Sequence, residues 1–166
     1  MKKSLLMVLT FGSGALLVGA ACASAPRPVA PRNLEFARCP GFVVTPTRID
    51  VGPAGGTFDI QPRHRIEFWP NAVSRPSSYQ VRRGGNADLA EIEILPLDGA
   101  VTEFDADVIL QVSYTGCPDA VKDQTDRYVL VETHPRNVSI GGRDRKAPDF
   151  YVRALVAHLT MFAIAH

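Results

Sequence analysis

The sequence predicts an all-β protein: a single antiparallel β-sandwich domain of about eight or nine strands, preceded by a signal peptide and a proline-rich linker. From residue 43 onward, apolar and polar residues alternate in short runs, which is typical of half-buried strands. Turn-forming residues separate these runs, and the 166 residues include 13 Gly and 13 Pro. We therefore expect a signal segment at 1–22, a linker at 23–38 and the sandwich at 39–166.

The first segment has the order of a secretory signal peptide. A positive start at 1–3 precedes an apolar run at 5–18, and small residues follow at 19–21. A membrane-spanning helix is the competing interpretation, but the run is shorter than the ~20 residues needed to cross a bilayer. The segment therefore predicts export.

The end of this segment, Val-Gly-Ala-Ala-Cys at 18–22, resembles the bacterial lipobox, in which the terminal Cys is acylated. This resemblance makes Cys22 the candidate lipidation site. Ordinary cleavage after Ala23 or Ala25 is the alternative. The following stretch at 25–32 holds three prolines, which favour an extended tether. We expect a protein of the bacterial cell envelope, anchored to a membrane through lipid on its periplasmic or surface face.

The charge balance argues against a nucleic-acid partner. The whole chain has 18 basic and 17 acidic side chains, and removal of residues 1–22 takes away Lys2 and Lys3 but no acid. The mature charge is therefore about −1. Proteins that bind nucleic acid by neutralising phosphates concentrate Lys and Arg far beyond this balance.

Seven internal runs are predicted to be strands. In the run at 64–68, His64, Ile66 and Phe68 share one face, and Arg65 and Glu67 share the other. The tail at 150–165 fits either a strand or a helical stripe that begins after Asp149. The internal runs are 42–45, 57–61, 64–68, 79–82, 90–95, 108–114 and 128–133.

Two cysteines remain if Cys22 carries lipid. Export to an oxidising compartment favours a disulfide between Cys39 and Cys117. That bond would close a loop of about 79 residues, for which the chain-entropy model gives on the order of 4.5 kcal/mol. Two separate buried thiols are the alternative.

Four segments, taken in order, resemble the zona-occludens/uncoordinated-five domain, the β-sandwich of ankyrins and netrin receptors. They are Gly-Pro-Ala-Gly-Gly-Thr-Phe-Asp-Ile at 52–60, Phe-Trp-Pro-Asn-Ala-Val at 68–73, Leu-Pro-Leu-Asp-Gly at 95–99 with the strand at 108–114, and the closing segment 156–165. Asn71 stands where the family usually has Gly, and Trp69 is inserted before the proline. The resemblance implies that the tail is a strand and that the domain is a binding and spacing module without catalysis.

No familiar catalytic motif is present. The chain lacks Gly-x-Ser-x-Gly, a phosphate-binding glycine loop and His-Glu-x-x-His. The four histidines are scattered, and His64, on an apolar strand face, is expected to be structural. The basic run at 143–146 could touch an acidic surface or lipid headgroups, although an ordinary solvated turn is the favoured interpretation. We expect neither a metal nor a cofactor.

We expect a non-catalytic cell-envelope lipoprotein that binds or spaces a protein or an envelope polymer. The candidate contact loops are 69–75 and 119–127, in which the acids could also be calcium ligands but are better explained as solvated side chains. The rival hypothesis is a small envelope hydrolase or sugar-acting enzyme whose carboxylate and His site is assembled only by the fold. The candidate contact residues are Trp69, Asn71, Arg75, Asp119, Asp123 and Asp126.

Overall fold

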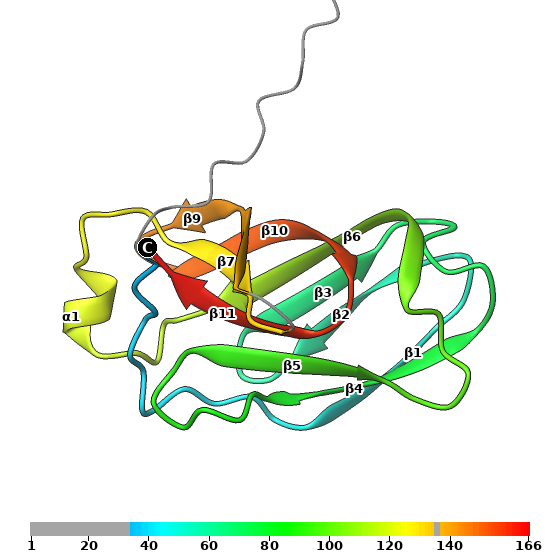
Figure 1. Cartoon of the computed structure of the whole chain (residues 1–166), viewed down its shortest axis with the longest axis horizontal. Coiled ribbons are helices and arrows are strands. Elements are labelled where there is room, and N and C mark those ends of the chain that lie inside the picture. Colours follow the sequence, from blue (N-terminus) through cyan, green and yellow to red (C-terminus); the bar gives the residue numbers. More distant parts are fainter. Residues whose placement is uncertain (1–33, 135–136) are drawn as a thin grey trace, which may run out of the picture.

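Two antiparallel sheets pack against each other in the computed structural model, which describes residues 34–134 and 137–166. The six-stranded sheet has the order β1 (Thr47–Val51), β4 (Ser77–Arg83), β5 (Glu91–Pro96), β11 (Met161–Ala165), β7 (Val129–Glu132) and β8 (Val138–Gly141). The five-stranded sheet has the order β2 (Gly56–Ile60), β3 (His64–Phe68), β6 (Glu103–Ser113), β10 (Tyr151–His158) and β9 (Arg143–Arg145). One short helix, α1 (Asp119–Lys122), follows β6 (Figure 1).

The core lies between the two sheets and is built by alternation along each strand. In β3, His64, Ile66 and Phe68 are buried, whereas Arg65 is exposed and Glu67 is half-buried. Strand β6 repeats the pattern, with Leu110 buried in the core. Burial of such side chains stabilises a fold by ~25 cal/mol for each Å² of apolar surface removed from water. The predicted β-sandwich is therefore confirmed.

The described residues contain more strands than the eight or nine expected. Strands β1, β8 and β9 lie outside the predicted runs, and the tail forms two strands in place of one. Strands β8 and β9 are four and three residues long and contain no fully buried apolar side chain, so they carry little of the apolar alternation that identifies a strand. The run at 42–45 is not a strand, although Phe42 and Val44 are buried. It starts at a turn, in which the Phe42 N–H donates to the carbonyl of Cys39.

The C-terminal tail forms two strands, one in each sheet. Strand β10 pairs with β6 and β9, and β11 pairs with β5 and β7 (Figure 1). The helical alternative for this segment is wrong, because both strands are held by sheet hydrogen bonds on both sides. Phe162 and Ile164, two residues apart on the same face of β11, belong to the core cluster. Ala163, on the other face, is buried as well.

The sandwich begins earlier than residue 39. Phe36 forms a bridge with Ala165, and the Ala37 N–H donates a 2.8 Å hydrogen bond to the carbonyl of Ile164. The last residues of the expected linker therefore belong to the domain. The expected signal peptide, Cys22 and the linker up to residue 33 lie outside the described residues.

A disulfide joins Cys39 to Cys117, with an S–S distance of 2.04 Å. Both cysteines are buried, and the bond ties the segment before β1 to the turn after β6, close to α1. The predicted pairing is thus present, and the alternative of two separate thiols is not. In the part of the chain that the structure covers, no helix is long and apolar enough to cross a membrane.

Candidate binding surface

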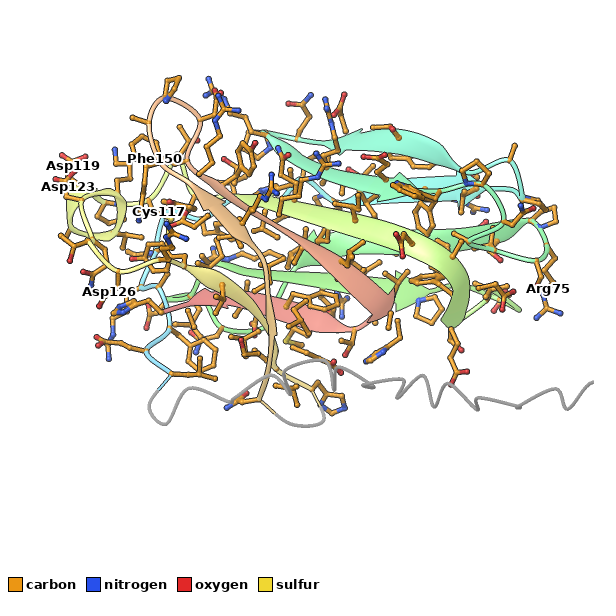
Figure 2. All side chains as sticks on the ribbon, turned by 90° about the horizontal axis from the view of Figure 1, so that it is seen from above. Arg75, Cys117, Asp119, Asp123, Asp126 and Phe150 are labelled. Carbon is orange, nitrogen blue, oxygen red and sulfur yellow. A yellow bond between two sulfur atoms is a disulfide. The ribbon has the colours of Figure 1, made fainter. Side chains whose placement is uncertain are left out.

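The two loops expected to contact a partner lie at opposite ends of the sandwich. Figure 2 shows Arg75 at one end of the molecule and Asp119, Asp123 and Asp126 at the other. The loops therefore cannot form a single continuous contact site, and each must be judged by its own contacts.

Backbone conformation and a hydrogen bond to another turn account for two of the three candidate residues of the first loop. Asn71 has a φ of 66°, the left-handed conformation that Gly and Asn adopt most readily, which explains Asn at a turn position. The Arg75 guanidinium donates a 2.9 Å hydrogen bond from Nη2 to the carbonyl of Gly99. Trp69 remains 46% exposed, so it is the candidate of this loop that presents an apolar surface to solvent.

The three acids of the second loop do not converge. Asp119 pairs with Lys122 at 2.7 Å, and this hydrogen bond lowers the pKa of the Asp119 carboxyl. Oδ2 of Asp126 instead lies 3.7 Å from Nδ1 of His166. Asp123 is the C-cap of α1, where its backbone N–H donates a hydrogen bond to the carbonyl of Asp119. Among the described residues, no group of three or more His, Cys, Asp or Glu side chains is placed to hold a metal ion.

The basic run at 143–146 is divided between the interior and the surface. The Asp144 side chain is only 1% exposed and pairs with Lys146 at 3.1 Å. Its Oδ1 accepts a 2.6 Å hydrogen bond from the Tyr114 hydroxyl, and its Oδ2 accepts one from the Tyr128 N–H. Burial, followed by the hydrogen bond to Asp144, raises the pKa of Tyr114. The residues on either side of Asp144, in contrast, are the exposed arginines of β9.

Arginines from several strands meet on the outer face of the five-stranded sheet. In the register of this sheet, Gln111 of β6 lies between two arginines, opposite Arg65 of β3 on one side and Arg153 of β10 on the other. Arg153 in turn lies opposite Arg143 of β9. Residues directly opposite each other project to the same side of a sheet, so these four side chains form one row across four strands. Neighbouring strands are ~4.8 Å apart, so the row spans about 14 Å.

A second row lies beside the first. Tyr151 is opposite Ser113 of β6 on one side and Arg145 of β9 on the other. The Arg145 guanidinium donates a 3.4 Å hydrogen bond to the Tyr151 hydroxyl, and this bond raises the pKa of Arg145. Arg63, in the turn between β2 and β3, lines the same hollow as Tyr151. We call the surface formed by both rows and Arg63 the arginine face.

Carboxylates hold three of these arginines in place. Arg65 pairs with Asp59 at 2.6 Å, Arg153 pairs with Glu67 at 2.8 Å, and Arg145 pairs with Asp149 at 3.9 Å. All three pairs are partly or largely exposed, so their contribution to stability is small. Their effect is to orient the guanidinium groups.

Among the residues that the structure describes, the other two arginines have no such partner. Within the described part of the chain, Arg63 and Arg143 form no ion pair. Five guanidinium groups against three carboxylates leave the arginine face with a net positive charge. Such a face attracts anionic groups even though the whole protein is nearly neutral.

Two adjoining polar hollows lie on the arginine face. One has a volume of about 260 Å³ and the other about 310 Å³, and both are lined by Arg63, Arg65 and Gln111. The first extends to Asp149 and Tyr151, and the second extends toward β2. These three side chains therefore form a wall that the two hollows share.

A second feature that the sequence did not predict is a carboxylate–imidazole pair. Nε2 of His158 lies 2.8 Å from Oε1 of Glu132, whose side chain is only 9% exposed. Glu132 ends β7 of the six-stranded sheet, and His158 ends β10 of the five-stranded sheet. They meet where the chain passes from β10 to β11, the neighbour of β7. His158 also lines a surface hollow with Glu103 and Thr102. A buried carboxylate that orients an accessible imidazole is an arrangement that acid–base chemistry can use.

No family model matches the chain, and no curated protein matches it in sequence. The resemblance to the zona-occludens/uncoordinated-five domain therefore stays a prediction.

Proposed function

We propose that this protein is a non-catalytic lipoprotein module of the bacterial cell envelope that binds an envelope polymer through the arginine face. The observation that carries the proposal is the row Arg65, Gln111, Arg153 and Arg143 across four strands. The side chains of this row come from strands far apart in the chain and share one accessible face. A sheet that presents oriented guanidinium groups on one face is suited to recognition of an extended anionic ligand.

The expected cellular location agrees with this proposal. A buried disulfide is typical of exported proteins, and the described domain contains one between Cys39 and Cys117. A lipid at Cys22 and the proline-rich stretch after it would hold the sandwich at a short distance from the membrane. Polymers of the envelope would then lie within reach of the arginine face.

The acids on the arginine face argue against nucleic acid as the ligand. Asp59, Glu67 and Asp149 lie among the arginines, so a densely charged phosphate backbone would meet repulsion as well as attraction. A polymer with widely spaced anionic groups and many hydroxyls suits this mixture better, because carboxylates accept hydrogen bonds from hydroxyls.

The test is retention of the purified mature protein by isolated cell-envelope fractions. The double variant Arg65→Ala/Arg153→Ala should bind at least tenfold more weakly than the wild type. The matched control is Arg48→Ala, because Arg48 is an exposed strand arginine of the other sheet that also pairs with a carboxylate, Asp50. Equal retention of the double variant and the wild type would refute the role of the arginine face.

A small envelope hydrolase is the second candidate function, and the pair His158 and Glu132 is the observation in its favour. Its test is a panel of hydrolase substrates assayed with the wild type, His158→Gln and Glu132→Gln. Turnover that both substitutions abolish, while the protein stays folded, would favour the enzyme over the binding module.

A further inference from the structure

The two polar hollows of the arginine face allow the ligand to be specified more closely, an inference that rests on the function proposed above. Small-ligand sites generally begin at ~300 Å³. At about 260 and 310 Å³, each hollow is near this lower limit, which suits one ring-sized unit rather than a large molecule. Because the hollows adjoin, a ligand made of repeated units would occupy both.

The shared wall of the hollows supplies the anion-binding groups. Asp59 engages Arg65 through Nε at 2.6 Å, and within the described residues the two Nη nitrogens of Arg65 have no hydrogen-bond partner. Arg63, on the same wall, forms neither an ion pair nor a side-chain hydrogen bond with any described residue. A guanidinium fork binds a carboxylate through two parallel hydrogen bonds.

The remaining lining groups suit hydroxyls. The Gln111 amide can both donate and accept hydrogen bonds, the Asp149 carboxylate accepts them, and Tyr151 adds a phenol and an aromatic ring. The second hollow contributes the carboxylate of Asp59 and the amide of Gln61. Donors, acceptors and one ring plane within a single small site match the chemistry of a sugar.

We propose that these hollows bind two consecutive units of an acidic polysaccharide. Arg63 and Arg65 hold a sugar carboxylate. The hydroxyls and the ring of the sugar are contacted by Gln111, Asp149 and Tyr151. The second hollow lies toward β2 and the first toward β10. The polysaccharide chain therefore runs across the strands. The carboxylates of Asp59 and Asp149 disfavour a bilayer surface, where anionic headgroups are closely packed, and they accept hydrogen bonds from a hydroxyl-rich chain.

The test uses the mature protein purified from membranes, with calorimetric titration against oligogalacturonate, a short polymer of sugar carboxylates. Binding should be lost or weakened at least tenfold in Arg63→Ala/Arg65→Ala and in Gln111→Ala. The variant Arg63→Lys should keep only part of the wild-type affinity, because an ammonium cannot bind two carboxylate oxygens at once. Arg48→Ala should bind as the wild type does. Thermal melting of every variant verifies that the exposed substitutions leave the fold intact.

The ligand class is tested by three other probes: neutral dextran of the same length, polyphosphate, and phosphatidylglycerol vesicles. We expect each to bind at least tenfold more weakly than oligogalacturonate. Binding of dextran equal to that of oligogalacturonate would overturn the role of the carboxylate, and preferential binding of polyphosphate or vesicles would overturn the choice of a polysaccharide. Absence of oligogalacturonate binding, with arginine-dependent retention by envelope fractions intact, would reject the acidic sugar and leave the binding function standing. Arginine-independent retention would reject both.

Discussion

The backbone N–H of Ser113 donates a 3.1 Å hydrogen bond to Nδ1 of His64, on the neighbouring strand. Because Nδ1 is the acceptor, Nε2 carries the proton and donates it to the carbonyl of Val43 at 2.9 Å. The neutral imidazole thus links β3, the end of β6 and the segment before β1. This arrangement is that of a structural histidine, as the apolar strand face predicts.

The first prediction concerns stability at mildly acidic pH. Burial lowers the pKa of His64 below its usual 6.5, although the hydrogen bond to the Val43 carbonyl acts in the opposite direction. The folded protein therefore binds the His64 proton less readily than the unfolded chain. The contribution of His64 to stability is complete above about pH 6.5 and is lost as the pH falls toward the lowered folded-state pKa, by up to ~1.4 kcal/mol per pH unit.

Urea unfolding of the wild type and of His64→Gln at several values between pH 7.5 and 5 measures this effect. The loss of stability on acidification should be smaller in His64→Gln than in His134→Gln, in which an exposed histidine is replaced. If His64→Gln does not fold, an NMR titration of the wild-type imidazole decides the question. A His64 resonance that titrates at or above pH 6.5 would contradict the prediction.

The second prediction concerns the buried carboxylate of Asp144. Its removal in Asp144→Ala takes this acceptor away from the Tyr114 hydroxyl, the Tyr128 N–H and the Lys146 ammonium. We expect the free energy of unfolding to fall by about 3 kcal/mol, because these polar groups lose their buried acceptor. Chemical denaturation measures the change, and Asp105→Ala, at an exposed position of β6, is the control. A loss no larger than that of the control would show that the cluster is not structural.

The third prediction concerns the disulfide between Cys39 and Cys117. It spans 78 residues of sequence, so its loss in Cys117→Ser enlarges the ensemble of the unfolded chain. We expect a cost of ~2–5 kcal/mol and a fall in Tm of roughly 10 °C. Thermal melting tests this, and peptide mapping without reduction should recover both cysteines in one linked fragment from the native protein. Two free thiols in that fragment analysis would rule out the bond.

The fourth prediction concerns the last strand. Phe162 is 1% exposed and belongs to the core cluster, so Phe162→Asp places a charge in the core and removes an aromatic ring. The variant should lose more than about 4 kcal/mol of stability, enough to unfold many domains of this size. The control is Val138→Asp on β8, where the side chain is 48% exposed. Similar circular dichroism spectra and melting temperatures for the two variants would contradict the assignment of Phe162 to the core.

The fifth prediction concerns Cys22, which lies outside the described residues. If the segment at 18–22 acts as a lipobox, the mature protein begins at Cys22 and carries two or three acyl chains, which is enough for stable anchoring. Intact-mass measurement of protein from membranes should detect this adduct. A mature chain that starts at Ser24 or Pro26 with no adduct would exclude lipidation.

The arginine face was only partly visible in the sequence. Alternation in the run at 64–68 places Arg65 and Glu67 on a solvent face, and the structure agrees. The run at 143–146 is basic in the sequence, and in the structure it separates into exposed arginines and the buried Asp144. Nothing in the local pattern indicates that Arg65, Arg153 and Arg143 share one row, because strand order and register are set by pairing between distant segments.

The sequence alone determined the strand character of the chain, the inward faces of several strands, and the Cys39–Cys117 pairing expected for an exported protein. These features follow from side-chain periodicity within a few residues and from the chemistry of the compartment. The folded domain was needed to reveal the strand order, the edge strands β8 and β9, the separation of the two candidate loops, and the contact of His158 with Glu132. Each of these features depends on which segments bury their surfaces against one another. That choice involves the whole chain, so it cannot be read from the residue pattern of any single segment.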